Sequence, residues 1–255
     1  MLKQFRTIGV GLVVLLVMGA IATAGAQAEN APFYTIEGKR LGEGESHHIS
    51  MKAANEKGIK WITPEAGITV SCKKVEIEGA TGTIVGSKEG EPGTSKGILL
   101  FKECTTTGNG ASCKIKEPLK TTMLKFEQVE DGTGKKLDTL IEPASGTEFW
   151  TIKFEGTCTN KETKLTGQTV AEDITDPGEE VIELGQPAKE AVSWDLRFPE
   201  ARIKEVTKYK AGVGTKTKVK ELVSFGEPSV WAGVALILLA NSEGKTEEKK
   251  WSPLP

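Results

Sequence analysis

The sequence predicts an all-β protein, an antiparallel β-sandwich or barrel-like domain held by disulfides. Short runs of β-favouring residues alternate with turns rich in Gly, Pro, Asn and Asp, which is the spacing typical of all-β folds. Glycine is abundant, with 29 residues in a chain of 255, as many tight turns require. No segment sustains the 3.6-residue apolar period of a helix, and no fixed-period repeat indicates a propeller or a solenoid.

The first half of the chain consists of short segments with alternating polarity. Ile68, Val70 and Cys72 alternate with polar residues, so they should share one face of a strand. Residues 89–97 combine Pro, Gly and charged residues, a composition that indicates a loop. The strands expected in this half are 33–36, 45–53, 58–63, 67–77, 80–86 and 97–104.

The second half continues the same pattern, ending in a strongly apolar run. Val234 to Ala240 is apolar on both faces, so we expect a central strand that is covered on both sides. The turn Asn241 to Gly244 should return the chain as a terminal hairpin. Only 50–57 and 183–192 could form a short helical turn. The strands expected here are 113–116, 119–129, 135–142, 147–156, 163–171, 190–197, 215–225, 229–240 and 245–251.

The first 28 residues have the pattern of a secretory signal peptide. Lys3 and Arg6 precede an uncharged apolar run of 14 residues, 8–21, and small residues follow at the spacing that signal peptidase requires. A transmembrane anchor would need about 20 apolar residues, so cleavage is favoured over a retained anchor. We therefore expect a secreted, extracellular domain over residues 29–255. The polar stretch 172–189 is the best candidate for a boundary between two subdomains or for a long loop that leaves a single domain.

Charge argues against nucleic acid as a partner. Without residues 1–28 the chain has 31 Lys and Arg against 35 Asp and Glu, a net charge of −4. Proteins that bind nucleic acid usually carry a basic surface. No later segment is long and apolar enough to span a bilayer, so no membrane span is expected in the mature chain.

Four cysteines should form two disulfides, because an even number in an exported chain is typical of a disulfide framework. Of three connectivities, we favour Cys104–Cys113, which encloses a Gly-Asn-Gly turn, with Cys72–Cys158 as a long-range link. The spacing contains no CxxC pair, which argues against a zinc site.

Catalytic motifs are weak throughout the chain. Residues 93–97 match the G-x-S-x-G motif around Ser95, but a strand rather than a helix should follow, and both histidines lie upstream. His47 and His48 are adjacent on an expected strand and would point to opposite faces. We therefore expect no enzyme and no cofactor. A hydrolase using two carboxylates is the alternative, because their separation is set by the fold.

An acidic segment at 172–180 could in principle hold calcium, as oxygen-rich loops do outside cells. It contains Glu172, Asp173, Asp176, Glu179 and Glu180 around a Pro-Gly turn. The spacing is not that of an EF-hand, so a solvated loop is favoured and no metal is expected.

Tryptophans are the candidate ligand-stacking residues. Exposed Trp rings on a β-sandwich can stack on the apolar face of sugars, although filling the core is the favoured role. The candidates are Trp150, Trp194, Trp231 and Trp251, of which Trp251 is expected to be the most exposed.

Several segments together resemble a group of secreted, β-rich hypothetical proteins abundant in soil actinobacteria. They are Pro32 to Leu41, Gly67 to Lys74, Pro92 to Gly97, Phe101 to Cys104, Cys113 to Lys116, Gly156 to Cys158 and Leu165 to Gly167. The resemblance covers most of the mature chain and implies export and a cysteine framework, but no activity.

The expected function is therefore a secreted, non-enzymatic binding or envelope-associated domain. Its expected partner is an extracellular polysaccharide or another cell-surface component, and the export pattern and the lack of a nucleophile–base set support this expectation. A carboxylate-based hydrolase and a self-associating structural surface protein are the alternatives.

Overall fold

Antiparallel β-structure accounts for nearly all the regular structure of the described residues. The computed structural model describes residues 31–158, 161–174, 182 and 190–254. Within these residues there is one short 3-10 helix, η1 (Gly79–Thr81), and no α-helix. The predicted fold class is therefore confirmed.

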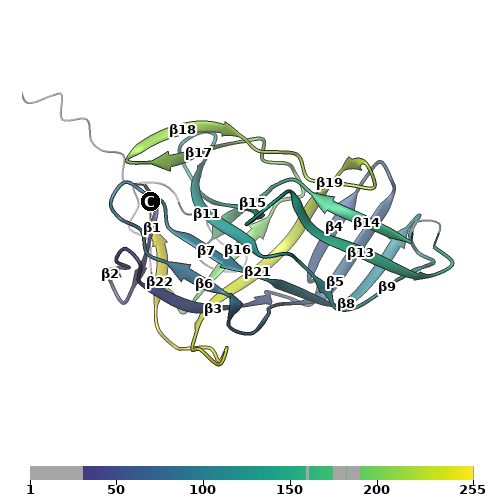
Figure 1. Ribbon diagram of the computed structural model, residues 1–255, viewed down its shortest axis with the longest axis horizontal. Helices are drawn as coiled ribbons and strands as arrows, with labels where there is room; N and C mark the ends of the chain where they lie inside the picture. Colours follow the sequence, from purple (N-terminus) through teal and green to yellow (C-terminus); the bar gives the residue numbers. More distant parts are fainter. Residues whose placement is uncertain (1–30, 159–160, 175–181, 183–189, 255) are drawn as a thin grey trace, which may run out of the picture.

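Eight strands close into a barrel, which occupies one half of the molecule (Figure 1). In order around the barrel they are β21 (Val230–Ala240), β16 (Ser193–Phe198), β15 (Thr169–Ile174), β12 (Leu137–Pro143), β11 (Leu124–Asp131), β7 (Thr94–Gly97), β6 (Thr83–Val85) and β3 (Ser46–Ala53). Pairing of β3 with β21, from Ala53 opposite Ala235 to His48 opposite Ala240, closes the ring. Closure pairs strands that would otherwise be open edges.

The other half of the molecule is a sandwich that extends from the same long strand. The first residues of β21 pair with β4 (Ile59–Thr63) instead of β3, and the sheet continues through β5, β8 and β10. A second sheet of five strands faces this extension (Figure 1). The remaining strands of the two sheets are β5 (Ile68–Ile77), β8 (Leu99–Gly108), β10 (Leu119–Lys120), β9 (Cys113–Ile115), β13 (Glu148–Gly156), β14 (Glu162–Thr166), β19 (Val223–Ser224) and β20 (Glu227–Pro228).

Two smaller units complete the fold. A three-stranded sheet of β2 (Lys39–Arg40), β1 (Phe33–Ile36) and β22 (Trp251–Leu254) lies at the barrel end away from the sandwich (Figure 1). A hairpin of β17 (Glu205–Lys210) and β18 (Val213–Lys218) is attached to the barrel because β17 pairs with the end of β11.

One hydrophobic cluster runs through both the barrel and the sandwich. In the sandwich it is aromatic: Trp150 and Trp231 are stacked with ring centroids 5.4 Å apart, and Phe101 meets both edge-on. A smaller cluster of Val129, Leu140, Val170 and Val206 lies on the outer face of the barrel, under the β17–β18 hairpin. The boundary predicted near 172–189 falls largely outside the described residues.

The favoured disulfide connectivity was wrong, although all four cysteines are paired. Cys72 bonds Cys104, and Cys113 bonds Cys158. The first pair lies directly opposite on neighbouring strands β5 and β8, with Cα atoms 3.9 Å apart. The chain then leaves this sheet after Gly108, so that β9 pairs with β13 in the facing sheet and Cys113 meets Cys158 rather than Cys104.

Sequence patterns missed or misplaced several strands. β7 lies inside the segment 89–97 predicted as a loop, and β17 was not predicted at all. The last strand, β22, pairs with β1, so the predicted terminal hairpin is wrong beyond the bridge between Ala240 and Thr246.

Two predicted strands are each divided where the chain passes from the sandwich half of the molecule to the barrel half. The run 119–129 contains β10 and β11, and the run 163–171 contains β14 and β15. Gly167 makes the second crossing, with a positive φ of 114° and a position where a Cβ would lie 2.0 Å from the Glu221 carbonyl oxygen. This crossing forms one side of the groove described next.

Candidate functional groove

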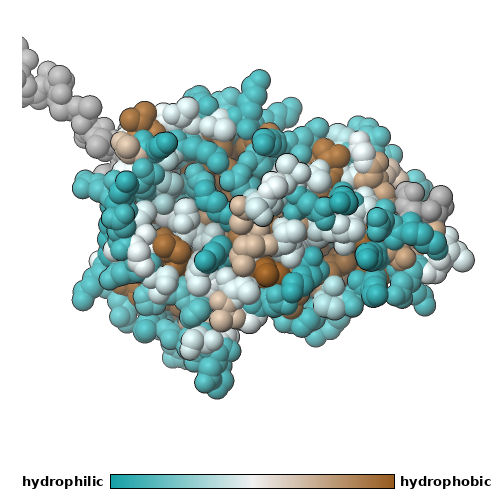
Figure 2. All heavy atoms as spheres, in the orientation of Figure 1, coloured by the Kyte–Doolittle hydropathy of each residue, from teal (hydrophilic) through white to brown (hydrophobic). Residues whose placement is uncertain are grey.

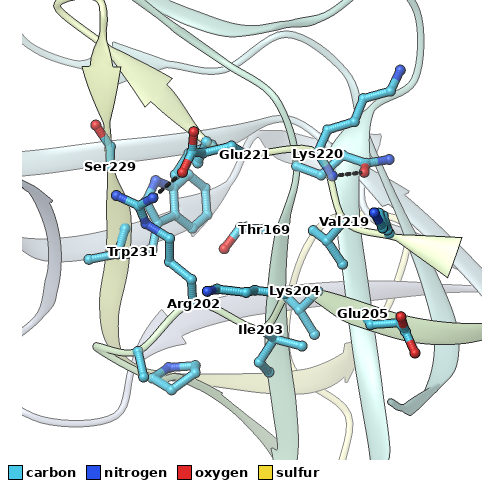
Figure 3. A pocket seen from close by; sticks show the side chains of 17 residues that line it. Thr169, Arg202, Ile203, Lys204, Glu205, Val219, Lys220, Glu221, Ser229 and Trp231 are labelled. Atoms are coloured by element: carbon cyan, nitrogen blue, oxygen red, sulfur yellow. Dashed lines mark hydrogen bonds and ion pairs between the residues drawn. The ribbon is translucent and has the colours of Figure 1, made fainter.

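A groove of about 450 Å³ opens where the barrel and the five-stranded sheet diverge (Figure 3). Four segments line it: 168–170 at the β14–β15 crossing, 199–205 between β16 and β17, 218–222 between β18 and β19, and 229–231 at the start of β21. This volume is in the range of sites that bind small ligands or parts of polymers.

The floor of the groove is apolar. Trp231, which is 2% exposed, lies at the back of the groove, with its other side against Trp150 (Figure 3). The other apolar lining residues are Val170, Pro199, Ala201, Ile203, Val219, Leu222 and Val230. An apolar floor of this kind would suit the hydrophobic face of a ligand.

The rim of the groove is polar and mainly basic. Arg202 forms an ion pair with Glu221, and the backbone N–H of Lys220 donates to Gln168 Oε1 over 2.7 Å. Figure 3 shows Lys204 extended across the groove and the Thr169 hydroxyl directed into it. Basic side chains over an apolar floor can bind a ligand that has both an anionic group and an apolar face.

Two carboxylates line the same groove, and each has a cationic neighbour. Glu221 accepts from Arg202, and Glu205 lies 3.7 Å from the Lys216 ammonium. The alternative of a carboxylate-based hydrolase stays an untested prediction, with Glu205 and Glu221 as the residues it would use here.

A second hollow lies on the other side of the β17–β18 hairpin, between β7, β11 and β17. Its charges are largely paired with each other: Glu127 is 2.6 Å from the Lys125 ammonium and 3.6 Å from that of Lys208. Glu127 is a buried residue of β11 in the barrel wall, and Lys208 belongs to β17. Their contact therefore connects the hairpin to the barrel. The groove beside Arg202 is therefore the better candidate for binding.

Buried carboxyl groups are concentrated in the barrel wall rather than in the groove. Burial raises the pKa of Asp173 to about 8, although the Thr139 hydroxyl donates to it over 2.9 Å. Burial, and then the nearby Asp173 carboxyl, raise the pKa of Asp138 to about 8. Among the described residues, neither oxygen of the Asp138 carboxyl has a hydrogen-bond partner. These groups do not line the groove, so they bear on stability rather than on ligand binding.

None of the four candidate tryptophans forms an exposed stacking platform. Trp150, Trp194, Trp231 and Trp251 are all at most 4% exposed. The expectation that Trp251 is the most exposed was wrong, because β22 packs beside Tyr34 and the indole N–H of Trp194 donates to the Trp251 carbonyl. Only Trp231 lines the groove, as part of its floor.

The other sequence motifs do not assemble into a site among the described residues. Ser95 lies in strand β7 and faces the barrel interior, so it is not on a nucleophile elbow. In the predicted calcium loop, Glu172 forms an ion pair with Arg197, whereas the adjacent Asp173 accepts a hydrogen bond from the Thr139 hydroxyl. The other acidic residues of that loop lie outside the described residues. Across the described ranges, no group of three or more His, Cys, Asp or Glu side chains could hold a metal ion.

No protein-family model matches the chain, and searches of curated proteins and of solved structures returned no match. The resemblance to secreted actinobacterial proteins therefore stays an expectation. Within the part of the chain that the structure describes, no helix is long and apolar enough to cross a membrane.

Of the residues that line the groove, the sequence analysis singled out Trp231 and missed the others. A signal was present: the segment 202–220 contains seven basic residues and one acidic residue. The near-neutral charge of the whole chain, −2, conceals this local excess. The rest of the groove is formed by Pro199, Ala201 and the segments 168–170, 221–222 and 229–231, and only the fold arranges these residues around one groove.

Proposed function

We propose that this protein is an exported, non-enzymatic binding domain that takes an extracellular carbohydrate or surface polymer in the groove beside Arg202. The groove itself is the observation that carries the proposal: a volume of about 450 Å³ with an apolar floor and a charged rim. Its position at the junction of two β-units places it on a rigid frame, which lowers the ordering cost of binding.

Export is supported by two independent features. The first 28 residues have the charge, apolar length and small-residue spacing of a signal peptide. The two disulfides fit the same location, because such bonds persist in oxidising compartments and are rare in the cytosol.

A groove-filling substitution tests the binding site. Ala201 lines the groove and is exposed, so Ala201→Trp should occupy the groove without disturbing the core. Calorimetric titration with a panel of soluble neutral and acidic polysaccharides should show binding by the natural protein and a loss of at least about tenfold in affinity in the variant.

The matched control is Ala111→Trp, which adds the same side chain at an exposed turn between β8 and β9. Its affinity should equal that of the natural protein. Absence of binding to every member of the panel, or equal loss in both variants, would contradict the proposed function.

A further inference from the structure

The charge of this protein is divided very unequally along the chain. Residues 202–220 contain Arg202 and six lysines against a single acidic residue, Glu205, so this segment carries a net charge of +6. The whole chain has a net charge of −2, which leaves −8 for the remaining residues. A cationic element on an otherwise acidic protein produces a strongly directional field.

The fold places this charge along one wall of the groove. Lys216, Lys218 and Lys220 alternate along β18 and the residues that follow it, so successive lysines lie about 7 Å apart. Of these three, Lys218 and Lys220 line the groove, as do Lys204 and Arg202. The basic row therefore leads along β18 into the groove.

Most of this charge is available to a ligand. Lys204, Lys210, Lys218 and Lys220 are exposed, and no ion pair is found for their ammonium groups among the described residues. By contrast, Lys208 faces Glu127 and Glu142 at 3.6 and 3.8 Å. The hairpin is thus attached to the barrel through Lys208. Lys216 lies 3.7 Å from Glu205, and Lys210 and Lys218 are exposed.

We infer that the ligand of the groove is a polyanionic polymer, a chain with repeating carboxylate or phosphate groups on apolar-faced units. This inference rests on the proposed function and specifies its ligand. The anionic groups lie along Lys216, Lys218 and Lys220, and one unit enters the groove over Trp231 beside Lys204. Alternating lysines on a strand match a linear ligand better than a single compact anion.

Two other anionic partners fit the surface less well. A bilayer would be expected to contact exposed apolar side chains, but the only large ones among the described residues are Val192 and Val213. The face shown in Figure 2 has only small, separate hydrophobic spots. Single-stranded nucleic acid would need aromatic platforms, and none of the described aromatic side chains is exposed.

The test compares two polymers that share a backbone and differ in charge. Polygalacturonate should bind at least about tenfold more tightly than fully methyl-esterified polygalacturonate, and raising NaCl from about 0.05 to about 0.5 M should remove most of the difference. A poly(glycerol phosphate) chain, tested in parallel, distinguishes phosphate from carboxylate as the source of the charge.

A triple variant tests the site. Lys204→Gln, Lys218→Gln and Lys220→Gln together should weaken polygalacturonate binding by about tenfold. The control combines Lys57→Gln, Lys73→Gln and Lys114→Gln, which are exposed lysines away from the groove with the same change in net charge. Its affinity should stay within about twofold of the natural protein.

Each outcome separates this inference from the proposed function. Equal binding of both galacturonate polymers, or an unchanged affinity in the groove triple variant, would contradict the inference that the ligand is a polyanion. Neither result would contradict the proposed function, binding of a ligand in the groove. Binding only to vesicles of anionic lipid, with none to either charged polymer, would also contradict the inference of a polyanionic polymer. Absence of any binding, in the panel and in these assays, overturns both.

Discussion

At the scale of single residues, the buried carboxyls of the barrel wall make stability depend on pH. Asp138 and Asp173 have pKa values of about 8 in the folded protein, raised mainly by burial. In the unfolded chain an Asp ionises near pH 4. Between about pH 4 and pH 8 unfolding therefore releases protons, and stability falls as the pH rises through this range. Each carboxyl lowers the free energy of unfolding by at most about 1.4 kcal/mol for each unit by which the pH rises.

Asp138→Asn should flatten this dependence. Asn has the shape of the acid without its charge, and within the described part of the chain the Asp138 carboxyl has no hydrogen-bond partner to lose. Urea unfolding at several values between pH 5 and pH 8 should show a smaller slope, and at pH 7.5 the variant should be more stable by about 1–3 kcal/mol. The control, Glu43→Gln, changes an exposed carboxyl and should leave the slope as it is. An unaltered slope in Asp138→Asn would show that this carboxyl is not the titrating group.

At the scale of elements, the disulfides reinforce different parts of the sandwich. Cys72–Cys104 joins two strands of one sheet, while Cys113–Cys158 joins β9 to the segment after β13 in the facing sheet. Their loops span 32 and 45 residues, so each bond should contribute about 4 kcal/mol in the chain-entropy model. Both lie in the sandwich half, and the barrel half is closed by strand pairing instead.

Peptide mapping without reduction should verify this connectivity. Trypsin releases Cys72 in 61–73, Cys104 and Cys113 together in 103–114, and Cys158 in 154–161. The observed pairing joins all three peptides into one species. A bond between Cys104 and Cys113 would instead leave 103–114 as a separate peptide.

Cleavage of the Asn109–Gly110 bond by hydroxylamine then separates the two cysteines of the middle peptide. Two species should result, one linking Cys72 to Cys104 and the other linking Cys113 to Cys158. Recovery of Cys72 with Cys113 would contradict the fold at the step from β8 to β9.

At the scale of the whole molecule, β21 connects the two halves. Its first residues pair with β4 in the sandwich and its later residues pair with β3 in the barrel. Gly233 lies at this change of partner, with a φ of 130° and a position where a Cβ would lie 2.5 Å from the Gly58 carbonyl oxygen. The core cluster is also continuous through both halves, so they should unfold together.

Gly233→Ala should lower the free energy of unfolding of the entire protein by more than about 2 kcal/mol. Backbone strain at a positive φ alone costs about 2 kcal/mol, and here the added Cβ also collides with a backbone carbonyl. Gly38→Ala is the matched control, since φ is 76° there and nothing lies within 4 Å of the added carbon. Unfolding followed by tryptophan emission and by far-UV circular dichroism should give coincident, lowered midpoints for Gly233→Ala. Separate transitions by the two probes would show that the halves unfold independently.

The sequence predicted correctly those strands in which the order of polar and apolar residues shows which faces are buried. In β5 the alternation of Ile68, Val70 and Cys72 sets the direction of each side chain, and Val70 and Cys72 are buried as expected. The long apolar β21 is central, as its two-sided composition indicated. In both strands, the apolar residues that become buried lie within a few positions of each other in the sequence, so a local pattern is sufficient to predict the strand.

Strands without such a pattern depend on their neighbours. Residues 94–97 contain no large apolar side chain, and they form β7 because β6 and β11 supply hydrogen bonds on both sides. Ser95 is then buried next to other polar groups of the barrel interior, including Gln128 and Thr139. Likewise, β17 mixes charged and buried residues without a regular alternation and is held by β11 and β18.

By itself, the sequence determined that this chain is all-β, that its cysteines pair and where most of its strands lie, because alternation and turn residues act over a few neighbouring positions. Only the tertiary structure decided which cysteines meet, that the tryptophans are buried, and that a basic hairpin borders a groove with Trp231 in its floor. These features join residues from separate segments of the chain, whereas alternation and turn residues report only on neighbouring positions.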